Sequence, residues 1–313
     1  MAEKLPINYA NLKNKSVIIT GGASGLGLAT TTRFAEHGAY VTIADIQDEA
    51  GKKHADELTS KGYNVTFVHC DTTSWTSSVA AFKHAANFSP RKTLDAAALF
   101  AGIGGDSTSL VSSIANSEPP SLEHDPAEPS SRILDINLDG VVKSTYLALH
   151  YFRLPAAEGT DAPKSTKKNL ILCASLAGYV DYPSTMYCVS KFGVRGLFRS
   201  LRGVAVKDPS SNLTVNVVCP GYTQTPMVLG SSKDDGTRSK AIQAITEKGL
   251  WSKLEHVVDF ASLCATNDEV NGRSFGTFPN GWFDLMEDQN EGYGGPKLLQ
   301  LINDNGFANT GLL

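Results

Sequence analysis

A tyrosine and a lysine near the middle of the chain are spaced for proton chemistry. Tyr187 and Lys191 are four residues apart, which places them on one face if the segment is helical. A free phenol ionises near pH 10, and a neighbouring ammonium group favours the phenolate and lowers that pKa. Such a pair can act as a general acid or base near neutral pH. The same spacing is also typical of an amphipathic helix with a buried tyrosine and a surface lysine.

A serine precedes this pair by twelve residues. Ser175 follows the apolar run 170–173, which predicts a buried strand. Open α/β sheets bind ligands beyond the carboxyl ends of their strands. We therefore expect the hydroxyl of Ser175 to meet Tyr187 at a substrate oxygen.

A glycine-rich segment near the N-terminus joins a predicted strand to a predicted helix. The strand is the apolar run 17–20, the glycines fall within 21–27, and apolar residues at helical spacing continue toward Gly38. Glycine lets the backbone approach a pyrophosphate, and the first N–H groups of a helix bind negative charge. This context is the one that a dinucleotide-binding loop requires, with an ordinary glycine-rich turn as the alternative.

Three further predicted strands end in residues suited to the rest of a dinucleotide. Residues 39–44 end at Asp45, whose carboxylate would accept hydrogen bonds from a ribose 2′-hydroxyl and repel a 2′-phosphate. No Arg or Lys follows within 46–49, so NAD is predicted in preference to NADP. The alternative role for Asp45 is to cap the next helix, and Asp48 is equally placed to do so. The strand 64–70 ends at Asp71, a candidate for the adenine amino group. The strand 94–102 ends in a small Ala-Gly pair that lets a cofactor lie against the backbone.

Composition favours an intracellular, globular α/β protein. The chain has 313 residues and a net charge of −4, which gives no sign of nucleic-acid binding. No apolar run approaches the length of a membrane span, and the first residues lack the apolar core of a signal peptide. The five cysteines form no metal or disulfide pattern, and the histidines show no metal spacing. The sequence therefore predicts a cytoplasmic protein with a small-molecule substrate, no metal and no membrane association.

Jointly, these motifs resemble the short-chain dehydrogenase/reductase family, in its main one-domain subgroup. Residues 20–27 resemble its Thr-Gly-x-x-x-Gly-x-Gly loop, and residues 219–225 resemble its Pro-Gly segment beside the nicotinamide. The resemblance implies a Rossmann-type doubly wound parallel sheet in three α/β/α layers. It implies a single domain over 1–313, with a core of about 12–278 and a C-terminal extension at 279–313. It also implies a homodimer or homotetramer that pairs helices at about 130–153 and 185–207.

The resemblance further implies the reaction and its residues. It implies NAD-dependent hydride transfer to or from a secondary alcohol or ketone, with Tyr187 as general acid and base. Asn137 would link Lys191 to solvent through a bound water, which completes a catalytic set of Asn137, Ser175, Tyr187 and Lys191. The implied cofactor-binding residues are Gly21, Ser24, Gly25, Leu26, Gly27, Asp45, Ile46, Asp71, Thr72, Ala101, Gly102, Tyr187, Lys191, Pro220, Gly221, Thr223 and Thr225.

The chain departs from the family pattern in four places. Phe100 replaces an asparagine that supports the central sheet, and the spacing from Ser175 to Tyr187 is one residue shorter than expected. The connection 104–130 is long, and 155–168 forms an extra polar loop that we expect at the surface.

The substrate side is less well specified. Residues 241–250 are an amphipathic stretch, for which the resemblance implies a mobile lid over the substrate, with a surface helix as the alternative. Residues 273–278 predict a last strand. The tail beyond is rich in apolar residues, so we expect it to pack on the core, on a partner subunit or at the pocket mouth. If it reaches the pocket, the substrate is expected to be largely apolar. A non-catalytic NAD sensor remains the alternative function, and an NAD-using lyase or epimerase is disfavoured by the short tail.

Overall fold

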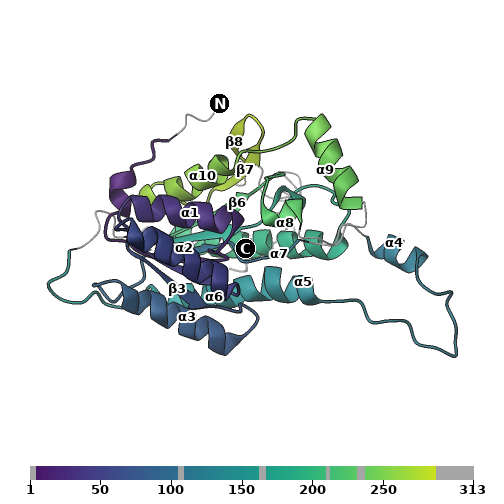
Figure 1. The fold of residues 1–313 in the computed structure, drawn as a ribbon, viewed down its shortest axis with the longest axis horizontal. Helices are drawn as coiled ribbons and strands as arrows, with labels where there is room; N and C mark the ends of the chain where they lie inside the picture. Colours follow the sequence, from purple (N-terminus) through teal and green to yellow (C-terminus); the bar gives the residue numbers. More distant parts are fainter. Residues whose placement is uncertain (1–4, 105–108, 162–166, 209–211, 231–236, 287–313) are drawn as a thin grey trace, which may run out of the picture.

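A single eight-stranded sheet organises the chain (Figure 1). The computed structural model describes residues 5–104, 109–161, 167–208, 212–230 and 237–286. The strand order is β3-β2-β1-β4-β5-β6-β7-β8, and every neighbouring pair is parallel except β7 and β8. The strands are β1 (Ser16–Thr20), β2 (Tyr40–Asp45), β3 (Val65–His69), β4 (Ala96–Leu99), β5 (Lys168–Cys173), β6 (Leu213–Cys219), β7 (Ser274–Phe278) and β8 (Gly281–Asp284).

Helices cover both faces of the sheet, which confirms the predicted doubly wound three-layer fold. One core layer joins the strands to α1 (Gly25–Glu36), α2 (Asp48–Ser60) and α10 (Leu254–Thr266). The other joins them to α3 (Trp75–Phe88), α6 (Gly140–Tyr151) and α7 (Thr185–Lys207). The central strands are buried on both faces, which explains why they are continuous apolar runs. The short elements are 3-10 turns at Tyr9–Leu12 and Leu176–Gly178 and the helices α4 (Leu110–Ala115), α5 (Arg132–Leu134), α8 (Pro226–Leu229) and α9 (Thr237–Glu247).

A π-helical turn interrupts the long helix that the sequence predicted over about 130–153. This turn, Asp135–Asp139, lies between α5 and α6. A π turn inserts one extra residue into the helical hydrogen-bond pattern and is frequent at functional sites. Asn137, at its centre, is fully buried.

The chain after β7 adds an antiparallel strand that the sequence did not predict. β8 pairs with β7 through the register Thr277 to Trp282. The Trp282 ring lies 5.1 Å from Phe275 and 6.4 Å from Phe260, centroid to centroid. This part of the apolar tail therefore packs on the core. The remaining predicted tail residues, from 287 onward, lie outside the described residues.

A buried lysine ties the amino ends of the strands to α10. Lys15 precedes β1 and is fully buried, and its Nζ donates hydrogen bonds to Asn169 Oδ1 at 2.6 Å and to the Ala265 carbonyl at 2.8 Å. Burial lowers the pKa of this amine from 10.5 to about 8, against the opposing attraction of nearby aspartates. A charged group is thus retained inside the sheet only through its polar partners.

No helix among the described residues is both long and apolar enough to cross a membrane. No cluster of His, Cys, Asp or Glu among them could hold a metal ion.

Candidate active site

The glycine-rich loop connects β1 to α1 with very little space for side chains. Gly21 has φ +69°, a conformation that favours glycine. A Cβ atom on Gly27 would lie 2.1 Å from the Gly21 carbonyl oxygen, so only glycine lets α1 begin this close to β1. Ser24 precedes the first residue of α1. The free N–H groups of this helix end therefore face the mouth of the loop, which suits a pyrophosphate.

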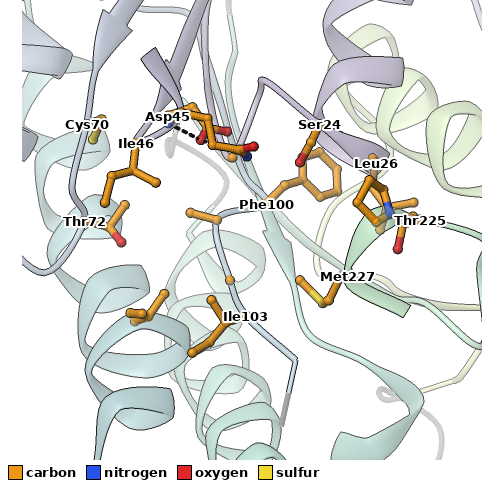
Figure 2. Close-up of a pocket in the computed structure, with 18 of the residues that line it drawn as sticks. Ser24, Leu26, Asp45, Ile46, Cys70, Thr72, Phe100, Ile103, Thr225 and Met227 are labelled. Atoms are coloured by element: carbon orange, nitrogen blue, oxygen red, sulfur yellow. Dashed lines mark hydrogen bonds between the residues drawn. The ribbon is translucent and has the colours of Figure 1, made fainter. Parts of the chain in front are cut away.

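A cavity of about 340 Å³ opens over this loop (Figure 2). It extends across the carboxyl ends of β1, β2 and β4, where open α/β sheets bind ligands. Twelve of the predicted cofactor-binding residues line it, which is a good fit to an elongated dinucleotide. They are Gly21, Ser24, Gly25, Leu26, Gly27, Asp45, Ile46, Asp71, Thr72, Ala101, Gly102 and Thr225.

Asp45 is held rigidly at the edge of this cavity. Its Oδ2 accepts a hydrogen bond from the Ala23 N–H and its Oδ1 accepts one from the Gln47 N–H, both at 3.0 Å. Only 5% of the residue is exposed. The N-terminus of α2 is not capped by this side chain, since Gln47 occupies the capping position without a side-chain bond. The carboxylate thus has a fixed orientation in the cavity wall, and Oδ2, with a single donor among the described residues, keeps a lone pair for a ligand.

Asp71 forms the next part of the wall. Its Oδ1 accepts hydrogen bonds from the Thr73 hydroxyl at 2.8 Å and the Thr73 N–H at 2.9 Å. These two bonds lower the pKa of the Asp71 carboxyl below its ordinary value. The side chain is therefore a charged acceptor at the end of β3.

The predicted Pro-Gly segment is only partly at the surface of this cavity. Among the described residues, Pro220, Gly221 and Thr223 do not line it, nor do they line the cavity that holds Tyr187, described below. The Gly221 N–H donates to the Thr277 carbonyl and hydroxyl oxygens, each at 3.2 Å, and buried Thr223 donates to the Gly221 carbonyl. In this arrangement the segment fixes the position of Thr225, which does line the cavity.

Several lining residues were not predicted from the sequence. Gln47 and Cys70 adjoin predicted residues and could have been found by extending those motifs. Arg132 and Ile136 approach from the π-turn region, which no local motif indicated. Phe100 packs against the core and also lines the cavity. The others are Ile103, Pro226 and Met227, and Figure 2 shows Ile103 and Met227 at the side of the cavity opposite Asp45.

Two predicted catalytic residues meet beside Gly102. The side-chain amide of Asn137 pairs with the backbone of Ile103, accepting from its N–H at 2.8 Å and donating to its carbonyl at 2.9 Å. A Cβ on Gly102 would lie 3.1 Å from Asn137 Oδ1 and 3.9 Å from Lys191 Nζ. The π turn therefore brings Asn137 close to Lys191 across the last residue of the Ala-Gly pair.

Lys191 also approaches the tyrosine that precedes it by one helical turn. Its Nζ lies 5.4 Å from the centroid of the Tyr187 ring and donates to the Cys173 carbonyl at 3.2 Å. Lys191 is 5% exposed. The predicted pair is thus on one face of α7, with the ammonium group buried beneath the ring.

Ser175 is positioned at the end of β5 but is engaged with the protein backbone. Its Oγ donates to the Pro220 carbonyl at 3.3 Å and accepts from the Ala177 N–H at 3.2 Å. Ser175 does not line either main cavity among the described residues. Donation of this hydroxyl to a substrate oxygen therefore requires it to exchange its long bond to the Pro220 carbonyl.

A second cavity, of about 380 Å³, holds Tyr187. It shares Met227 with the first cavity, and its Gly104 directly follows Ile103 of the first. Its walls come from three parts of the chain: residues just before and in α7, residues 222–228, and the C-terminal half of α9 with the turn after it. The lining residues are Gly104, Tyr182, Pro183, Ser184, Tyr187, Tyr222, Met227, Val228, Ala241, Ile242, Ala244, Ile245, Lys248 and Leu250.

Comparison with known proteins identifies the family of this chain. The family model described as short chain dehydrogenase matches residues 15–236. The chain belongs to the short-chain dehydrogenase/reductase family. A 5'-hydroxyaverantin dehydrogenase from Dothistroma septosporum is 39% identical to it over 298 residues, which are 95% of this chain and 94% of that protein.

Two other similar proteins show the range of the family. An NADP-dependent dehydrogenase from Cochliobolus lunatus is 30% identical over 270 residues, which cover 85% of this chain and 89% of that protein. The crystal structure of gox2181 has a TM-score of 0.67 and 23% identity, covering 85% of this chain and 96% of that one. This likeness supports the fold alone. The family members bind a nicotinamide cofactor and act as oxidoreductases on small molecules, which confirms those two predictions for this short-chain dehydrogenase.

Proposed function

We propose that this short-chain dehydrogenase is an NAD(H)-dependent alcohol dehydrogenase or ketoreductase. The observation that carries the proposal is the meeting of the two cavities at Met227, with Tyr187 in the second and the buried ammonium group of Lys191 beneath its ring. A bound nicotinamide would accept or supply hydride. Tyr187 would take the proton from a substrate hydroxyl during oxidation and return one during reduction, while Ser175 holds the substrate oxygen.

The remaining members of the proposed catalytic set support the tyrosine. Lys191 would bind the nicotinamide ribose and stabilise the phenolate, because a fixed cation favours the ionised form of a nearby group. Asn137 holds the backbone of Ile103 at the junction of the cavities. Its place in the π turn supports a water-mediated link from Lys191 to solvent. Donors that are fixed in advance in a water-poor site are effective because they need no reorganisation.

Asp45 supports NAD as the cofactor. Its carboxylate lines the cavity, and Arg132 is the only basic side chain among the described lining residues. A 2′-phosphate beside Asp45 would meet negative charge at close range. NADP is the competing candidate, because the Cochliobolus lunatus relative is named for it.

The second cavity supports a largely apolar secondary alcohol or ketone as substrate. Met227, Val228, Ile242, Ile245 and Leu250 contribute most of its apolar wall. The Dothistroma septosporum relative is named for 5'-hydroxyaverantin, and we propose a substrate of comparable bulk. α9 forms one wall, which is consistent with the lid predicted for residues 241–250.

We also propose a cytoplasmic homo-oligomer. The five cysteines are free, as expected in a reducing compartment. The outer faces of α6 and α7 carry exposed apolar side chains, among them Tyr146, Phe192 and Val204. Such side chains on the two helices predicted to pair are suited to a subunit interface.

Replacement of Tyr187 tests the assignment. In Tyr187→Phe, NADH-dependent reduction of a ketone panel, followed at 340 nm, should fall by about 10²–10⁴-fold because the general acid is lost. The affinity for NADH, measured by fluorescence titration, should change less than about twofold. Equal losses of turnover and cofactor affinity in a folded variant would contradict the catalytic role. A wild-type protein that binds NADH but turns over no alcohol or ketone would favour the sensor alternative.

A further inference from the structure

Three phenol groups share the second cavity, and proton transfer uses only one of them. Tyr182 and Tyr187 have ring centroids 5.7 Å apart at an interplanar angle of 47°, and Tyr222 lines the same cavity from the segment 222–228. Burial raises the pKa of Tyr182, and the nearby Tyr222 and Tyr187 raise it further. A neutral phenol both donates and accepts a hydrogen bond. Within the described part of the chain, none of these three hydroxyls has a protein hydrogen-bond partner. Tyr182 and Tyr222 therefore offer two unused polar groups to a ligand.

A lysine is fixed on the opposite element of the same cavity by the turn that ends α9. The Gly249 N–H donates to the Thr246 carbonyl and the Leu250 N–H donates to the Ile245 carbonyl, both at 3.0 Å. Gly249 has φ +63°. This is a Schellman turn, which is normally accompanied by an apolar contact between residues in the positions of Ile245 and Leu250. Lys248 lies between them in sequence, and all three line the cavity. A cation at a helix C-terminus is also favoured by the helix dipole.

The segment that carries Tyr222 is attached to the chain that follows this turn. The Ser252 N–H donates to the Tyr222 carbonyl at 2.7 Å, and Thr223 and Ser252 form a β-bridge. Tyr222 and Lys248 are therefore held on connected parts of the backbone. Both residues are exposed, and this connection holds their backbones at one side of the cavity.

The chemistry of this polar region identifies a class of ligand. A purely apolar substrate would displace the water that solvates Tyr182, Tyr222 and Lys248 and would form no hydrogen bonds to replace it, which is unfavourable. A weakly acidic hydroxyl accepts from an ammonium group and exchanges hydrogen bonds in both directions with phenols, and the surrounding rings and aliphatic groups suit an aromatic frame. We propose that the substrate is an aromatic ketone or alcohol with a second, phenolic hydroxyl away from the reacting carbon, and that Tyr182, Tyr222 and Lys248 bind this hydroxyl. The inference rests on the proposed function, because it assigns Tyr187 to the reacting oxygen.

Matched ketones test the proposal. NADH-dependent reduction of 6-hydroxy-1-tetralone and 6-methoxy-1-tetralone should show kcat/KM at least about tenfold higher for the hydroxy compound, since a site built to bind a hydroxyl rejects an analogue without it. In Lys248→Met and in Tyr222→Phe this ratio should fall toward 1, through a higher KM for the hydroxy compound alone. Lys248→Arg should retain part of the preference. Lys240→Met, on α9 but not lining the cavity, should leave the ratio unchanged.

A binding experiment separates this inference from the proposed reaction. Titration calorimetry of the NAD-saturated protein should give tighter binding of 2-naphthol than of 2-methoxynaphthalene by at least about tenfold, and Lys248→Met should abolish the difference. If wild-type protein shows this Lys248-dependent preference but no turnover, the ligand class stands and the proposed reaction fails. If turnover is present but folded Lys248→Met and Tyr222→Phe keep the wild-type ratio, the ligand class is wrong.

Discussion

The buried amine of Lys15 should make this protein more stable as the pH rises above neutrality. The folded-state pKa is about 8, against 10.5 for an ordinary lysine. Below pH 8 the Lys15 amine is charged in both the folded and the unfolded protein. Burial of this charge lowers the free energy of unfolding by about 3 kcal/mol, from 2.5 pKa units at about 1.36 kcal/mol each. Between pH 8 and 10.5 the unfolded chain binds more protons than the folded one, so the free energy of unfolding rises with pH over this interval.

The variant Lys15→Met isolates this effect, because it removes the titrating group and keeps most of the side chain. The loss of the hydrogen bonds to Asn169 and Ala265 adds a constant offset. We expect the free energy of unfolding of the wild type, minus that of the variant, to increase by about 2.5 kcal/mol between pH 7 and pH 10. Urea denaturation followed by circular dichroism at one-unit steps measures it. Lys52→Met, at an exposed position of α2, should show no such trend. A difference that stays flat or falls with pH would refute the reasoning.

Two further predictions concern the cofactor and the C-terminal hairpin. Asp45→Asn removes the charge and keeps an acceptor oxygen for only one of the Ala23 and Gln47 N–H groups. The ratio of kcat/KM for NADH over NADPH should fall at least about tenfold, a change of about 1.4 kcal/mol; an unchanged ratio in a folded variant would exclude Asp45 as the discriminating group. Trp282→Ala removes a half-buried ring from contact with Phe260 and Phe275 and should lower the free energy of unfolding by about 2–3 kcal/mol. Urea denaturation that shows no loss would mean that the hairpin contributes little to the core.

The cofactor half of the site could be predicted from the sequence because its signals are local. The glycine loop, Asp45 and Asp71 each directly follow an apolar run, and in a parallel sheet those strand ends meet at one edge. The same argument placed Ser175 at the end of β5. Local pattern also placed Tyr187 and Lys191 on one helical face, as the structure has them.

The features that were missed depend on tertiary packing. Arg132 and Ile136 line the cavity from α5 and from the π turn that follows it. The π turn inserts only one residue, so its sequence has no periodic pattern that differs clearly from that of an α-helix. β8 is only four residues long, and its pairing with β7 is decided by the burial of Trp282. The bond between Ser175 and the Pro220 carbonyl joins elements 45 residues apart. Pro220 and Gly221 line neither the cavity over the glycine loop nor the cavity that holds Tyr187, and their contact with the cofactor stays a prediction.

The two ends of the sheet affect how this protein behaves at high concentration. Exposed edge strands are templates for pairing with other chains, and proteins protect them by keeping them short or charged. β3 ends with His69, whose Nδ1 lies 2.8 Å from Asp48 Oδ1. β8 has only four residues and ends at Asp284, which pairs with Arg273. Within the part of the chain that the structure describes, neither border strand is a long apolar ladder, so sheet extension is disfavoured as a route to self-association. The homo-oligomer proposed above would then form through helical surfaces and could stop at a closed, countable assembly.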